Sequence, residues 1–269
     1  MGTRLAYSSF PPITLGALRF ILATILLAAI VLSAPHHRRL PARKDLKSMA
    51  FAGFLGVTLY FSLENIGIGL TSAANAALIV ASYPAITALL EWLIYKVPVS
   101  KLKLSGIALA VLGVVVLTHN DKTAGNGNQL IGNIILIATG FVWAFYTFTT
   151  RKLSHKYTTI TCTFYQTLFG ALFFIPLSLI DIDRWSKPSW DSILCLLYLS
   201  FFCSVIAFVL YNFGLKKLSS STSVSLMNLV PVFGVIFSML VLKESLEMIQ
   251  LLGGVIIITG VFISVKFSN

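Results

Sequence analysis

Three ionisable side chains, Arg19, Glu64 and Glu91, lie inside long apolar stretches of this sequence. Charged groups are costly in apolar surroundings, so they usually face the interior of a helix bundle or a wet cavity, where they bind ions, protons or charged substrates. With a rise of 1.5 Å per helical residue, Arg19 lies about 12 Å and Glu64 about 6 Å from the same side of the apolar layer, so the two can approach each other. Glu91 lies only about 5 Å from the opposite side, near Lys96, and we interpret it as a plain interface residue.

Neutral polar and aromatic side chains in the same stretches are candidates for the wall of a cavity that binds a small amphipathic molecule. They are Asn65, Tyr60, Tyr83, Trp143, Gln166, Tyr211 and Asn228. Most such side chains in helix bundles only pack, anchor at the interface or cross-link helices, and that alternative stays open for each of them. Pro84 and Pro231 lie near the middle of their apolar stretches, so we expect helix kinks there, which shape the bundle or flex during gating.

The residues that usually support catalysis do not cluster in this sequence. The four histidines lie in loops or at the ends of apolar stretches, and Cys162, Cys195 and Cys203 lie within such stretches without the spacing of a metal site. No glycine-rich loop is placed to hold a phosphate, so an ATPase within this chain is excluded. We therefore expect no enzyme activity, no cofactor and no metal.

The apolar stretches recur along the whole chain of 269 residues, of which 57% are hydrophobic and only 11% are charged. Soluble domains carry about 25% charged residues. A stretch of about 20 apolar residues crosses the hydrocarbon core as a helix, because lipid offers no partner for backbone polar groups. We predict an all-α integral membrane protein with nine transmembrane helices, at about 11–33, 49–68, 73–94, 103–118, 130–150, 158–180, 191–211, 222–242 and 249–266.

The net charge of +11 resides mainly in the short loops between these stretches. Alternate loops, together with the C-terminal tail, hold fourteen Lys and Arg residues on one side and only five on the other. Such an imbalance orients a membrane protein with its basic loops in the cytoplasm and gives no basic face for nucleic acid. We therefore expect a multi-pass protein of the cell (inner) membrane, surrounded by lipid, with a cytoplasmic C-terminus.

An internal repeat appears when the chain is shifted by 147 residues, with no gap. Asn65 then meets Asn212, Pro84 meets Pro231, and further matches pair Leu63, Gly67, Ser72, Lys96, Gly106 and Gly113 with Leu210, Gly214, Ser219, Lys243, Gly253 and Gly260. Each unit has five helices, an odd number, so the second unit enters the membrane from the opposite side. Inverted repeats of this kind are typical of transporters, whose sites lie near the midplane.

The repeat also predicts a ten-helix plan of which the first helix is missing, because the partner of 130–150 would precede Met1. We divide the chain into a first repeat at 1–119, a linker at 120–129 and a second repeat at 130–269. The counterparts of Arg19 and Glu64 are the neutral Gln166 and Tyr211, so the shared scaffold does not require the charges. This favours a functional role for Glu64 over a packing ion pair and leaves Arg19 undecided.

The sequence resembles the EamA-type transporters of the drug/metabolite transporter superfamily. The resemblance rests on 18–20 (LRF), on the stretch from Glu64 to Leu78 that ends in TSAANAAL, on the two prolines, and on 219–226, 243–244 (KE), 253–254 (GG) and Gly260. The first repeat departs from the pattern with Val97 where the second has Glu244. The resemblance implies ten helices in two inverted halves around a central cavity, and export or exchange of metabolites such as amino acids.

Taken together, these features predict a secondary transporter that exports or exchanges a small amphipathic metabolite by alternating access, with proton entry considered as the driving force. One alternative is a channel-like or structural membrane protein without alternating access. Another is a membrane-embedded enzyme, which would need an acid/base or metal cluster at one interface. The substrate and the choice between monomer and homodimer stay open.

Overall fold

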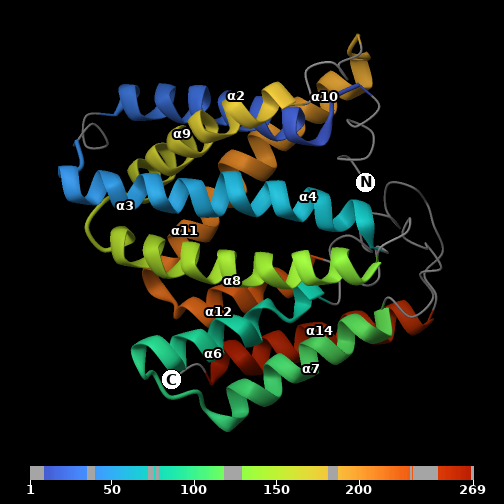
Figure 1. The fold of residues 1–269 in the computed structure, drawn as a ribbon. Coiled ribbons are helices and arrows are strands. Elements are labelled where there is room, and N and C mark those ends of the chain that lie inside the picture. The colour runs from blue at the N-terminus through green and yellow to red at the C-terminus, as the bar shows by residue number, and fades with distance from the viewer. Residues whose placement is uncertain are drawn as a thin grey trace. The chain divides into compact units, whose positions relative to one another are not determined.

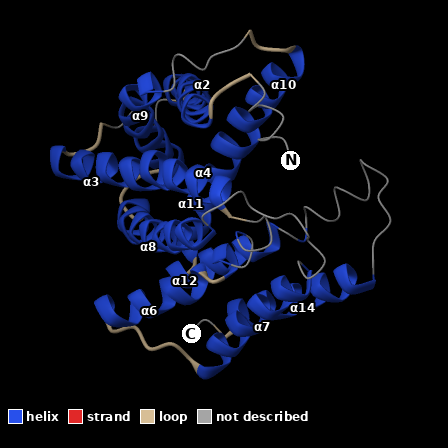
Figure 2. Ribbon diagram, turned by 45° about the vertical axis from the view of Figure 1, so that its right-hand side comes forward, coloured by secondary structure: helices blue, strands red, loops and turns tan. Residues whose placement is uncertain are grey.

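The structure is a computed structural model, and it describes residues 9–34, 40–71, 76, 79–117, 129–180, 187–230, 232 and 248–267. Every regular element in these ranges is a helix (Figure 2). The chain forms two compact units, one made of Met1–Asn65 and Phe145–Lys217, the other of Ile66–Ala144 and Leu218–Asn269.

The first unit holds seven whole helical elements and parts of two others. They are α2 (Pro12–Ser33), α3 (Arg43–Gly53), the π-helical segment η2 (Phe54–Leu59), α4 (Tyr60–Leu70, which continues into the second unit), α9 (Thr159–Ser178), α10 (Trp190–Tyr198), the π-helical segment η4 (Leu199–Ile206), α11 (Ala207–Lys217) and the last residues of α8 (Gln129–Ser154) (Figure 1). The second unit holds most of α8, with α6 (Tyr83–Tyr95), α7 (Lys101–Leu117), α12 (Ser220–Ser225), the 3₁₀ turn η5 (Leu226–Leu229) and α14 (Met248–Lys266).

Five helices in the described part of the chain are long and apolar enough to cross a membrane. They are Pro12–Ser33, Arg43–Leu70, Gln129–Ser154, Thr159–Ser178 and Trp190–Lys217. Shorter apolar helices cover Ile79–Tyr95 and Leu251–Lys266. The all-helical class is therefore confirmed. The linker expected at 120–129 and most of the span expected at 222–242 lie outside the described residues.

Several helices begin at hydroxyl side chains that cap their first turn. Thr158 accepts a hydrogen bond from the backbone N–H of Thr161, and Ser189 accepts one from that of Ser192. Ser219 does the same for Thr222 at the start of α12. The first N–H groups of a helix have no partner within it, so these caps stabilise helix ends by about 1 kcal/mol each.

Helix starts recur at the interval of the sequence repeat. The pairs α2 and α9, α3 and α10, α4 and α11, and α7 and α14 each begin 147 residues apart. The two π-helical segments also occupy corresponding positions, since η2 shifted by 147 residues falls on 201–206 within η4. π-helical turns are rare and often mark functional places in a helix.

Helices α7 and α14 pack at backbone contact through glycines (Figure 1). A Cβ added at Gly106 would lie 2.8 Å from the carbonyl oxygen of Gly260, and one added at Gly113 would lie 3.0 Å from that of Gly253. The two helices therefore run antiparallel. Replacing each residue by its counterpart 147 residues away turns the first contact into the second, so the two contacts are counterparts of each other in the sequence repeat.

We expect Gly260→Ala to destabilise the protein by about 1–3 kcal/mol, because the new Cβ would lie 2.7 Å from the carbonyl oxygen of Gly106 and the helices must move apart. Gly254→Ala on the same helix is the matched control, since among the described residues its Cβ would meet only Val232, at 3.9 Å. Thermal melting in detergent should show a loss for the first variant and none for the second. Equal melting of both would refute the close packing.

Candidate functional site

Arg19 lies on α2 in the first unit and is 9% exposed. Its Nε donates a hydrogen bond of 2.8 Å to Oγ of Ser204, which belongs to the π-helical segment η4. The guanidinium carbon also lies 4.8 Å from the ring centre of Phe20 and 4.6 Å from that of Phe61. Cation–π contacts of this kind stabilise a charge that has left water, so the fold holds this guanidinium inside the unit.

Glu64 lies one turn beyond Phe61 on α4. The hydroxyl of Tyr60 donates a hydrogen bond of 2.8 Å to its Oε1, and Arg19 is close enough for the two charges to interact. Asn65 is next to it and donates to the carbonyl oxygen of Pro12 over 3.4 Å. The structure therefore brings together the four candidates Arg19, Tyr60, Glu64 and Asn65, which we call the charged cluster.

Gln166 belongs to a second group of polar side chains in the same unit, which carries no charge. Its Nε2 donates to Thr150 over 3.0 Å, and its Oε1 accepts from Nδ2 of Asn212 over 3.2 Å. Asn212 also donates to Thr163 over 2.9 Å and accepts from the hydroxyl of Tyr146 over 3.0 Å. All five side chains are at most 1% exposed. We call this the neutral cluster.

Tyr211 extends the neutral cluster. Its hydroxyl shares a hydrogen bond of 2.7 Å with that of Thr147, and its ring stacks on Tyr146 with centres 6.3 Å apart. The sequence pattern did not single out Thr150, Thr163 or Asn212 as site residues. The available signals were the match of Asn212 to Asn65 in the repeat and the hydroxyls spaced along α8.

Aromatic rings separate the two clusters. Phe208 lies 6.2 Å from Phe61 on the side of the charged cluster and 6.2 Å from Tyr146 on the side of the neutral cluster. Phe61 and Phe208 are themselves counterparts 147 residues apart. The two clusters are therefore linked through a pair of rings that are counterparts in the sequence repeat.

The other candidates lie in the second unit. Tyr83 is fully buried, and its hydroxyl donates to the carbonyl oxygen of Leu136 over 3.0 Å and contacts Thr139, so it cross-links α6 to α8. Trp143 is 5% exposed. Asn228 donates to the carbonyl oxygen of Ala81 over 3.2 Å, again a contact between counterparts, while its Oδ1 has no hydrogen-bond partner in the part of the chain that the structure describes.

Pro84 occupies the first turn of α6, where its missing N–H leaves no hydrogen bond unmade. The helical chain before it is interrupted at Ser82, whose N–H and hydroxyl both bond to the carbonyl oxygen of Ile79. The position is therefore a break between two helical segments. Pro231, the other expected kink, lies outside the described residues.

The interpretation of Glu91 as a plain interface residue is wrong, because its side chain is only 3% exposed. Its carboxylate accepts hydrogen bonds of 3.3 Å from the backbone N–H groups of Ser220 and Ser221, and one of 2.7 Å from the hydroxyl of Ser221. Lys103 bonds to the neighbouring Ser219 over 3.1 Å. A carboxylate at the N-terminus of a helix accepts hydrogen bonds from backbone N–H groups that have no partner within the helix. Glu91 therefore links α12 to α6.

The chemistry that these side chains support is binding and proton exchange. Glu64 combines a carboxylate with a phenol donor and a nearby guanidinium, which suits a proton or a zwitterion with an ammonium and a carboxylate. Within the described ranges, no three His, Cys, Asp or Glu side chains are grouped so as to hold a metal ion.

Comparison with known proteins gives a consistent result. The model of the EamA-like transporter family matches residues 1–119 and 130–266. An uncharacterized transporter of Archaeoglobus fulgidus is 29% identical and the match covers 97% of this chain and 90% of that protein. The uncharacterized transporter YyaM of Bacillus subtilis is 30% identical, over 94% and 84% of the two chains.

Two further similarities concern fold and a named substrate class. A probable terminal-alkyne amino-acid exporter of Streptantibioticus cattleyicolor is 25% identical over 95% of this chain and 88% of that protein. A solved crystal structure with 19% identity superposes with a TM-score of 0.78 and covers 99% of this chain and 93% of the other.

Proposed function

Because the chain belongs to the EamA-like transporter family, we propose that this multi-pass membrane transporter is a secondary transporter. It exports or exchanges a small amphipathic metabolite such as an amino acid or a derivative by alternating access, coupled to proton entry. It resides in the inner membrane with its C-terminus in the cytoplasm.

The observation that carries the proposal is a set of contacts, within each unit, that follow the 147-residue interval of the sequence repeat. Helix starts repeat every 147 residues, and the counterparts α7 and α14 pack antiparallel through contacts that interchange between the halves. Phe61 contacts Phe208, and Ala81 contacts Asn228, each across the 147-residue interval of the repeat. These contacts support two inverted repeats, the arrangement in which secondary transporters expose one site to either side in turn.

The unequal clusters of the first unit support a site for a proton and a substrate. Both repeats place polar groups at equivalent positions, yet only the first repeat has charged ones, Arg19 and Glu64, where the second has the neutral Gln166 and Tyr211. A scaffold that packs with neutral residues in one half does not need charges in the other. Glu64 is therefore assigned to proton or ammonium binding, with Tyr60 and Asn65 beside it.

The substrate class rests on the chemistry of this cluster and on one relative. The guanidinium of the cluster matches the carboxylate of an amino acid, and the carboxylate of the cluster, with its neighbouring phenol, matches the ammonium group. The apolar rings around them match an apolar side chain. The similar protein of Streptantibioticus cattleyicolor is named a probable terminal-alkyne amino-acid exporter. Both point to export of an amino acid or derivative.

The distribution of basic loops predicts which loops face the cytoplasm. In a variant whose three native cysteines are replaced by alanine, Ala42→Cys should be protected from an impermeant thiol reagent added to intact cells, whereas Lys187→Cys should label readily. Both positions are exposed in the structure, so access depends on the side of the membrane. Labelling of residue 42 with protection of residue 187 would contradict the orientation.

The proposed activity is tested by a flux screen. Purified protein in proteoliposomes is offered single radiolabelled amino acids and derivatives, with and without an inward proton gradient. We expect at least one substrate to accumulate saturably and more strongly with the gradient. Permeation of every solute in proportion to its concentration would instead indicate a channel.

A further inference from the structure

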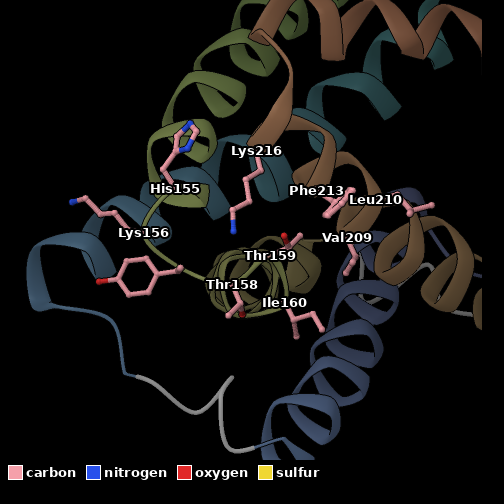
Figure 3. Close-up of a pocket in the computed structure, with 10 residues that line it drawn as sticks. His155, Lys156, Thr158, Thr159, Ile160, Val209, Leu210, Phe213 and Lys216 are labelled. Carbon is pink, nitrogen blue, oxygen red and sulfur yellow. The ribbon is translucent and has the colours of Figure 1, made fainter.

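A cavity of about 720 Å³ opens in the first unit beside the N-terminus of α9 and the C-terminal half of α11 (Figure 3). One end of it is polar, with Lys216, His155 and Thr159, and the other is apolar, with Val209, Leu210 and Phe213. None of these side chains belongs to the charged or the neutral cluster. The cavity is therefore separate from the site assigned above.

The polar end offers positive charge to an anion. Lys216 is exposed and extends toward α9, where Thr159 begins the helix (Figure 3). The cap made by Thr158 satisfies the N–H of Thr161, so the N–H groups of Thr159 and Ile160 remain at the positive end of the helix. The neighbouring Lys156 already pairs with Asp45 at 3.0 Å, which leaves Lys216 as the main cation of the cavity.

The apolar end of the cavity can contact a hydrocarbon chain. Leu210 and Phe213 lie one turn apart on α11 and are 63% and 51% exposed. In a membrane protein, large exposed apolar side chains contact acyl chains. Positive groups at the end of a membrane-crossing helix, directly beside such side chains, match the headgroup and the chain of one molecule.

We propose that this cavity binds an anionic phospholipid, with the phosphate at Lys216 and the N-terminus of α9 and an acyl chain along Leu210 and Phe213. The positive charge at the polar end favours an anionic headgroup. Because the polar wall continues directly into an apolar wall, the cavity fits a molecule with both a headgroup and an acyl chain, which is a lipid. By the distribution of basic loops, the lipid comes from the cytoplasmic leaflet.

The test uses the full chain in detergent with phosphatidylcholine, to which phosphatidylglycerol is added stepwise. The melting temperature is measured at each step, and the bound lipid is measured by native mass spectrometry. We expect Lys216→Gln to weaken phosphatidylglycerol binding about five-fold, the effect of one cation at a membrane surface. Lys216→Arg keeps the charge and should bind like the wild type, which separates lost binding from faulty folding.

Lys217→Gln is the matched control, because it removes the same charge from the next residue along α11. The Lys217 ammonium lies 5.6 Å from the centre of the Phe213 ring, and Lys217 is not among the residues that line the cavity. It should retain binding. Equal losses in Lys216→Gln and Lys217→Gln would overturn the site in favour of general surface charge. Equal stabilisation by inorganic phosphate, without phosphatidylglycerol, would overturn the assignment to a lipid.

Discussion

Glu64→Gln is expected to abolish the dependence of transport on a pH gradient while the protein still folds. The amide cannot take up or release a proton, but its oxygen still accepts the hydrogen bond that Tyr60 donates over 2.8 Å. The equivalent place in the second repeat holds Tyr211, so packing at this position does not need a carboxylate. Flux into proteoliposomes of the substrate found in the screen, measured at several proton gradients, gives the result.

Glu64→Asp serves as the control because it keeps the ionisable group, and it should retain part of the pH dependence. Melting curves in detergent accompany the flux, and we expect the curves of Glu64→Gln and the wild type to agree. Normal pH-dependent flux with a collapsed melting temperature would show that Glu64 only pairs with Arg19 to fix the helices. The site assignment would then fall.

Glu91→Ala is expected to have the largest effect on stability, a loss of about 3 kcal/mol. The change removes the acceptor for two backbone N–H groups and one hydroxyl at the start of α12, all of them buried. Buried donors that lose a charged acceptor carry the full cost of desolvation. Thermal melting in detergent, together with the yield of monodisperse protein, measures the loss.

Glu91→Gln is the matched variant for this prediction. Its amide oxygen can still accept from α12 but carries no charge, so we expect a smaller loss of about 1–2 kcal/mol. A Glu91→Ala protein that melts like the wild type would restore the interpretation of this residue as an interface side chain.

The membrane class, the all-helical fold and the family could be predicted from the sequence, and all three are confirmed. They depend on properties that a sequence states directly: the length of apolar stretches and the recurrence of Asn, Pro and Gly at one interval. The sequence also predicts that Arg19 and Glu64 can approach each other, because their depths follow from their positions along the helices.

The error at Glu91 has a physical cause. Depth along α6 placed it near an interface, but burial depends on what packs there, and the start of α12 comes from 129 residues further along the chain. Thr150, Thr163 and Asn212 of the neutral cluster were missed for a similar reason. Whether Tyr146 and Asn212 meet depends on the rotation of α8 and α11 about their axes, which the apolar pattern of a lipid-exposed helix constrains weakly.

The proposal that this chain transports by alternating access is tested most directly by counterflow. Proteoliposomes are loaded with unlabelled substrate, diluted into trace labelled substrate without any proton gradient, and sampled over time. We expect a transient accumulation of label above its equilibrium level, because a carrier that exposes one site to each side in turn exchanges faster when both sides hold substrate. Label that only relaxes to equilibrium, at a rate unaffected by the internal substrate, would contradict alternating access and favour a channel.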